Sequence, residues 1–142
     1  MRRILILIVL ALGLPVSAFA QDKAGGFFQD YDEMRQVLDR LVLDRSINEM
    51  MVEFSSEDAM SVPDRIALEA QVRGLFPDPL SNVAIMQTSE MENGFSQQFL
   101  AYWDGANRYL YIQLLLQERD GRLLVIHLGL NSDIVEFLPY MI

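Results

Sequence analysis

The fold is decided by residues 82–130, which read NVAIMQTSEMENGFSQQFLAYWDGANRYLYIQLLLQERDGRLLVIHLGL. Three turn signals interrupt this stretch: Asn93-Gly94, the segment Asp104 to Asn107, and Arg119-Asp120-Gly121. Asn-Gly and Asp-Gly pairs favour the tight turns that join antiparallel strands, because both residues tolerate a positive φ. The spacing therefore predicts a meander of four antiparallel strands, near residues 82–91, 96–104, 107–118 and 122–130.

The turns also predict a register. Met91 is expected to pair with Ser96, Trp103 with Arg108, and Glu118 with Arg122. Directly opposed residues share a face of the sheet, so one face is then nearly all apolar and should meet the helices. Its members are Ala84, Met86, Thr88, Phe99, Ala101, Leu110, Ile112, Leu114, Leu116, Leu124, Ile126, Leu128 and Leu130.

The opposite face is mixed, with amides and tyrosines among apolar residues. In the predicted register Ser89, Gln98, Gln113 and His127 form one row across it. The candidate ligand or partner face consists of Ser89, Gln98, Tyr109, Tyr111, Gln113 and His127. Amides and tyrosines with few charges suit a protein interface. Plain solvated surface and a ligand or catalytic site are the alternatives.

Upstream of Pro77-Asp78-Pro79 the apolar residues recur every three or four positions, which is typical of amphipathic helices. Helices are predicted near residues 27–42, from Ser46 onward, and over Val62 to Arg73; Ser46 with Glu49 matches the capping-box pattern. The predicted fold class is α+β, with two to three N-terminal helices packed on one face of a four-stranded antiparallel meander sheet.

This order of elements resembles the NTF2-like, or cystatin-like, α+β superfamily, in which helices lie across a curved sheet. The resemblance covers most of residues 27–138 and rests on element order. It implies dimerisation through the outer sheet face, or a pocket between helices and sheet. In isomerase and hydratase members that pocket holds acidic, tyrosine or histidine side chains. Here the expected helix-facing surface is Leu, Ile, Phe and Ala, so no catalytic residue is carried over.

The first 20 residues have the three parts of a secretory signal peptide. Arg2 and Arg3 precede an apolar run from Ile4 to Val16, and Ser17-Ala18-Phe19-Ala20 supplies small residues before the expected cut. The run is shorter than the roughly 20 residues that a bilayer span needs. We therefore expect a signal peptide at 1–20, a flexible lead-in at 21–26 and a single domain at 27–142, exported to the periplasm or the exterior without a membrane span after cleavage.

Composition narrows the possible chemistry. The chain has 20 Asp and Glu against 11 Lys and Arg, a net charge of −9. Loss of the leader removes two arginines and no acid, which leaves about −11. Such a charge repels phosphate backbones, so we expect no nucleic-acid partner. The chain has no cysteine and one histidine, which excludes thiolate sites and two-histidine zinc motifs. We expect no metal and no cofactor.

These exclusions favour non-catalytic binding, by a homodimer through the mixed sheet face or by an accessory to another envelope protein. Whether the protein is an enzyme stays open. The alternatives are a small hydrolase or isomerase, or a carrier of an apolar ligand held by Leu110, Ile112, Phe99 and Ile126. A cavity with two or more convergent titratable groups would favour the enzyme, and a closed apolar interior would favour the binding module.

Overall fold

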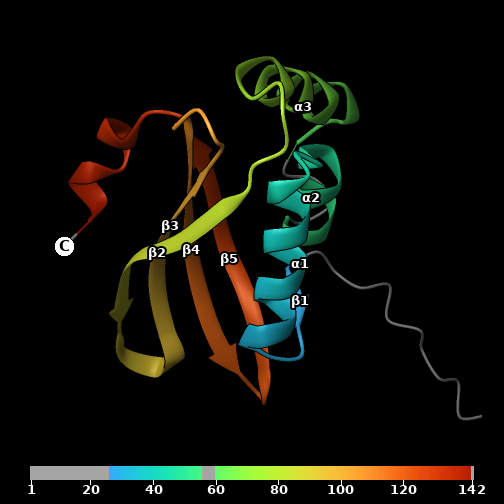
Figure 1. Ribbon diagram of the computed structural model, residues 1–142. Coiled ribbons are helices and arrows are strands. Elements are labelled where there is room, and N and C mark those ends of the chain that lie inside the picture. Colours follow the sequence, from blue (N-terminus) through green and yellow to red (C-terminus); the bar gives the residue numbers. More distant parts are fainter. Residues whose placement is uncertain (1–25, 56–59, 142) are drawn as a thin grey trace, which may run out of the picture.

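The computed structural model describes residues 26–55 and 60–141 (Figure 1). In chain order its elements are β1 (Phe27–Phe28), α1 (Tyr31–Leu43), α2 (Ile47–Phe54), α3 (Val62–Leu75), β2 (Asn82–Glu90), a 3₁₀ turn (Glu92–Gly94), β3 (Phe95–Trp103), β4 (Tyr109–Arg119), β5 (Arg122–Asn131) and two further 3₁₀ turns (Ile134–Glu136 and Leu138–Tyr140). The fold is α+β with an antiparallel sheet, which confirms the predicted class. No helix among the described residues is long and apolar enough to cross a membrane.

The sheet has five strands and not the predicted four, in the order β1-β5-β4-β3-β2. The last four form the expected meander. Phe27 and Phe28 were assigned to the start of the first helix, but they form a short strand that pairs with Leu124 and Leu123 of β5. The helix begins only at Tyr31, because the Asp30 carboxylate caps it.

Capping fixes where two of the helices start. The Asp30 carboxylate accepts a hydrogen bond from the Glu33 backbone N–H at 2.8 Å, and the Ser61 hydroxyl accepts one from the Asp64 N–H at 3.3 Å. Each satisfies a backbone donor that the first helical turn leaves unpaired. The capping box predicted at Ser46 is not formed, because the Ser46 hydroxyl instead donates to Asp44 at 2.9 Å.

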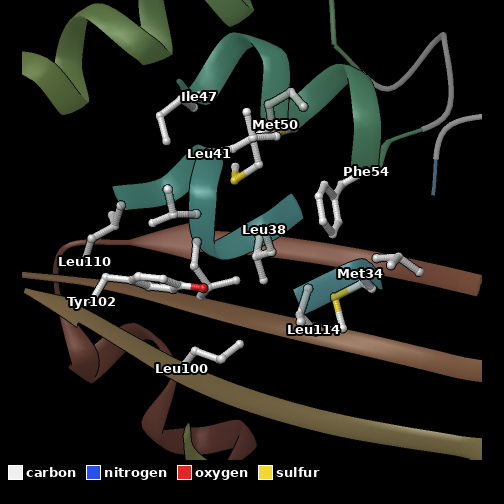
Figure 2. Close-up of a cluster of buried hydrophobic side chains, with 14 of the residues drawn as sticks. Met34, Leu38, Leu41, Ile47, Met50, Phe54, Leu100, Tyr102, Leu110 and Leu114 are labelled. Atoms are coloured by element: carbon white, nitrogen blue, oxygen red, sulfur yellow. The ribbon is translucent and has the colours of Figure 1, made fainter. Parts of the chain in front are cut away.

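The core lies between α1, α2 and one face of the sheet. In Figure 2, Met34, Leu38 and Leu41 of α1 and Ile47, Met50 and Phe54 of α2 point toward Leu100, Tyr102, Leu110 and Leu114 of the sheet. All these side chains are buried. Burial of large apolar side chains is the main stabilising term for a domain of this size. The methionines fill irregular space in this core, as flexible thioethers can.

The predicted register is wrong at all three turns, each time by one residue. Glu90 pairs with Ser96, Trp103 with Tyr109, and Arg119 with Arg122. The backbone explains the third turn: Asp120 and Gly121 have φ of 54° and 71°, as in a two-residue turn with both central residues at positive φ, whereas a three-residue loop was expected. At the second turn Asn107 adopts φ 58°, and the loop is longer than predicted.

Bulges shift the pairing again within two strands. One bulge lies between Ile85 and Gln87 of β2. The other lies in β5, where Val125 pairs with Leu116 and His127 pairs with Leu115, so that Ile126 between them has no partner on β4. The helix-facing side of the sheet therefore differs from the predicted apolar face. Leu110, Ile112, Leu114 and Leu116 lie on it as predicted, but β3 contributes Gln98, Leu100 and Tyr102 where Phe99 and Ala101 were expected.

The C-terminal segment lies on the side of the sheet away from α1 and α2 (Figure 1). Phe137 is buried there, with its ring 6.0 Å from that of Phe99, which is itself buried on the outer face. The Asp133 carboxylate caps the first 3₁₀ turn by accepting from the Val135 N–H at 2.9 Å. The outer face is thus partly covered by the chain's own last residues.

Candidate functional site

The outer sheet face holds five of the six predicted site residues. Tyr109, Tyr111 and Gln113 stand on β4, with Ser89 on β2 and His127 on β5. Gln98 lies on the other face, because β3 is inverted relative to the prediction. The predicted row is therefore wrong: Ser89 pairs with Gln97, Gln97 with Leu115, and Leu115 with His127. Gln113 belongs to the neighbouring row, opposite Phe99 and Gly129.

Three aromatic rings stand side by side at one end of this face. The Trp103 and Tyr109 ring centroids are 5.8 Å apart, and the nearly parallel rings of Tyr109 and Tyr111 are 5.9 Å apart. Partial burial raises the pKa of the Tyr111 phenol, and Tyr109 and Asp133 add to this effect. Aromatic rings offer much contact area at small entropic cost, which is why they are common in binding surfaces.

A second group of side chains converges over Gly129. A β-carbon there would stand 3.2 Å from the His127 imidazole Nε2, 3.7 Å from the Phe137 ring and 3.8 Å from the Gln113 amide oxygen. The absence of a side chain at Gly129 therefore makes room for all three. An imidazole and an amide beside an aromatic ring can donate and accept hydrogen bonds, but the three side chains nearest to Gly129 include no serine or carboxylate to make a catalytic set.

The charge distribution of the outer face is unusual for so acidic a chain. The outward-facing positions of β2 to β5, all within the described residues, carry no Asp or Glu. Their only charged residues are Arg119 and Arg122, at the β4–β5 turn. Apolar side chains are exposed in the same region: Tyr109 is 38% exposed, Ile126 at the bulge 45%, and Tyr140 of the C-terminal segment 56%.

The helix-facing side carries a polar chain that sequence reasoning missed. The Tyr31 hydroxyl donates to the Gln98 amide oxygen at 3.0 Å, and Arg35 donates to Tyr31 at 3.2 Å and to both Asp39 oxygens at 3.1 Å. The buried Tyr102 hydroxyl donates to Asp39 at 2.7 Å. The chain therefore links α1 to β3 through five polar side chains.

Burial and pairing shift the pKa values within this polar chain. Burial raises the pKa of the Tyr102 phenol above its usual range, and the hydrogen bond to Asp39 raises it further. For Arg35, burial favours a lower pKa, but the bond with Tyr31 and the charge of Asp39 outweigh burial and the pKa is raised. Both groups are thus held protonated at neutral pH. This arrangement serves to position charges, since neither group can exchange a proton readily near pH 7.

A cavity of about 260 Å³ opens beside this chain, at the end of the sheet that carries the β2–β3 turn. Tyr31 and Gln98 line it together with Ser96, Glu90 and Glu118. The spacing of Tyr31 and Arg35 on one helical face was the available sequence signal. It could not be connected to Gln98, because that residue was assigned to the opposite face.

No group of three or more His, Asp or Glu side chains in the described part of the chain could hold a metal ion. Comparison with known proteins gives no relative: no protein-family model, no curated protein and no solved structure matches the chain.

Proposed function

We propose that the protein is an exported binding module that pairs with a second copy of itself through the outer sheet face. The observation that carries the proposal is the absence of carboxylates from the outward-facing positions of β2 to β5, in a chain with 20 acidic residues. Two molecules of the cleaved chain, each with a net charge of about −11 after loss of Arg2 and Arg3, repel one another. They can approach closely only where that charge is missing, and the outer face is such a place.

The chemistry of the face supports an interface. One end of the face offers Trp103, Tyr109 and Tyr111, and aromatic residues are enriched in protein interfaces while acidic ones are depleted. The C-terminal segment adds exposed Val135, Leu138 and Tyr140 beside it. An exposed apolar area of this kind in a water-soluble domain commonly marks a surface that is covered by a partner.

Light scattering on the purified chain tests the proposal. We expect the parent to be a dimer, and the single variants Tyr109→Glu and Ile126→Glu to be folded monomers, because each places an unpaired carboxylate on the face that forms the contact. The matched control is Ile66→Glu, which makes the same kind of change at a 56% exposed site on α3. A control that dissociates equally would assign the effect to net charge. A parent that is monomeric at all concentrations would remove the homodimer and leave another envelope protein as the partner.

Export and the NTF2-like arrangement belong to the same proposal. Arg2-Arg3, the apolar run after them and the small residues before Gln21 support cleavage, and the helices beside an antiparallel sheet support the likeness of architecture. Expression of the complete coding sequence in a bacterial host, followed by intact-mass measurement, should find a chain that begins at Gln21. A mass that retains residues 1–20 would count against cleavage there.

A small hydrolase or isomerase is the second candidate, and one observation favours it. The cavity between α1 and the sheet is lined by Tyr31, Glu90 and Glu118, so titratable groups face it where an apolar surface was expected. A general acid in this cavity would need a carboxyl that still holds its proton near neutral pH. NMR titration of the two glutamate carboxyls tests this point: a carboxyl that titrates near pH 7 supports a general acid and hence the enzyme, and two that titrate below pH 5 count against a general acid in this cavity.

A further inference from the structure

A groove of about 440 Å³ runs between the C-terminal half of α3 and the neighbouring ends of β4 and β5. Its walls are Leu68, Val72 and Leu75 of α3 and Leu110 and Leu130 of the sheet. The volume lies within the range of small-molecule sites, which is roughly 300–1,000 Å³. Of the four residues expected to line an apolar cavity, only Leu110 lines this groove. Ile112 is buried in the core, Phe99 lies on the outer face, and Ile126 is exposed at the bulge of β5.

Both polar and apolar contacts hold α3 beside the groove. The Asn48 backbone N–H of α2 donates to Glu69 at 2.9 Å, and the Asn48 side-chain oxygen accepts from Arg65 at 3.1 Å. Val72, the one buried residue of α3, belongs to the hydrophobic core, and Leu68 packs against that core. The aliphatic side of the helix therefore contacts the core at these two residues while it borders the groove.

The lining selects the class of ligand. It contains five aliphatic side chains, no aromatic ring and no charged group, and its polar members are Gln71, Asn131 and Ser132. An aromatic ligand would find no ring to stack on, and a charged ligand would find no counter-charge. We propose that this groove binds a single unbranched alkyl chain with a neutral, hydrogen-bonding end group such as an alcohol, ester or amide. The proposal concerns a region other than the outer sheet face and does not depend on dimerisation.

Gly74 gives direct experimental access to the groove. It lines the groove, and no atom lies within 4 Å of the position that its β-carbon would occupy. Its φ is not in the left-handed region, so any side chain can be added without backbone strain. Gly74→Phe should fill the groove while leaving the fold intact. Gly74→Ala is the matched control, because it makes the same backbone change with one small methyl group.

The experiment measures binding of octan-1-ol, decan-1-ol and dodecan-1-ol to the full chain by isothermal titration calorimetry. We expect each added methylene that enters the groove to tighten binding roughly 3- to 4-fold. Decanoate, which carries a charge, should bind at least tenfold more weakly than decan-1-ol at pH 7. Circular dichroism and Tm confirm that each variant is folded.

Gly74→Phe should weaken decan-1-ol binding at least tenfold, with Gly74→Ala close to the parent. Three results would overturn the proposal: no saturable binding to the parent, equal affinity of the Phe variant and the parent, or affinities that do not depend on chain length. The Tyr109→Glu variant should bind the alcohols as the parent does. Loss of binding in that variant would place the alkyl chain at the outer sheet face and also refute the groove.

Discussion

Replacing Tyr102 by phenylalanine removes one hydroxyl from the centre of the core and nothing else. That hydroxyl is fully buried and donates to the Asp39 carboxylate at 2.7 Å. A hydrogen bond to a charged group contributes about 1.5–3 kcal/mol to stability. For a domain of this size such a loss lowers Tm by roughly 6–12 °C. Thermal and urea denaturation of Tyr102→Phe at pH 7 should both find this change, with the m-value unaltered.

The difference in stability between the parent and Tyr102→Phe should decrease at high pH. The pKa of Tyr102 is raised in the folded protein, so the contribution of its hydroxyl is fully present below the unfolded pKa of about 10 and decreases as the pH rises toward the folded value. The gap between parent and variant should therefore be constant from pH 6 to 9 and narrow above pH 10. Tyr109→Phe is the control, since its hydroxyl lies on an exposed residue. A loss below about 0.5 kcal/mol for Tyr102→Phe, or one equal to that of the control, would refute this role of the polar chain.

Three further predictions concern turns and close contacts. The buried Asp104 carboxylate accepts hydrogen bonds from the Arg108 backbone and guanidinium and from the Ala106 backbone, and these bonds lower its pKa. Asp104→Asn should lower Tm at pH 7 and reduce the loss of Tm below about pH 4, because the parent loses this stabilisation as the pH falls from the unfolded pKa toward the lowered folded pKa. Gly94→Ala should cost about 1–3 kcal/mol by chemical denaturation, because the glycine has φ +78° and a β-carbon would stand 2.5 Å from a backbone oxygen of β4; Gly74→Ala should cost nothing. Gly129→Ala should shift the NMR signals of His127, the sole histidine, because its Nε2 stands 3.2 Å from the new methyl group.

The helices and the existence of the meander could be predicted from sequence, because both depend on local signals. Apolar residues at three- and four-residue spacing placed α1 to α3 within a few residues, and three Gly-containing turns marked the strands. The register could not be predicted from the same turns. A two-residue turn at Asp120-Gly121 and a three-residue loop there differ by one residue in length, and that residue inverts every side chain of the next strand.

Burial alone could not correct the error, because β3 carries apolar residues on both faces. Phe99 and Leu100 are equally buried, one beneath Phe137 and the other beneath the helices. The error in the register of β3 changed the candidate site. Five of its six predicted residues share the outer face, but Gln98 was predicted to lie there too and instead faces the helices, where it accepts a hydrogen bond from Tyr31. A long-range contact of this kind leaves no trace in local spacing.

Several exposed apolar side chains of this domain lie in the two proposed regions. Tyr109, Val135, Leu138 and Tyr140 belong to the outer face and its C-terminal segment, and Leu75 lines the α3 groove. Val62 and Ile66 lie on α3 outside the groove lining, and Val52 of α2 and Ile85 of β2 lie in neither region. A solvated surface with no partner would be expected to mix such residues with carboxylates, as the rest of this acidic chain does. The outward-facing strand positions carry no Asp or Glu, and the lining of the α3 groove carries no charge, so each region has a composition that suits a covering partner. The outer face is broad and aromatic and suits a protein, while the groove is narrow and aliphatic and suits a single chain of methylenes.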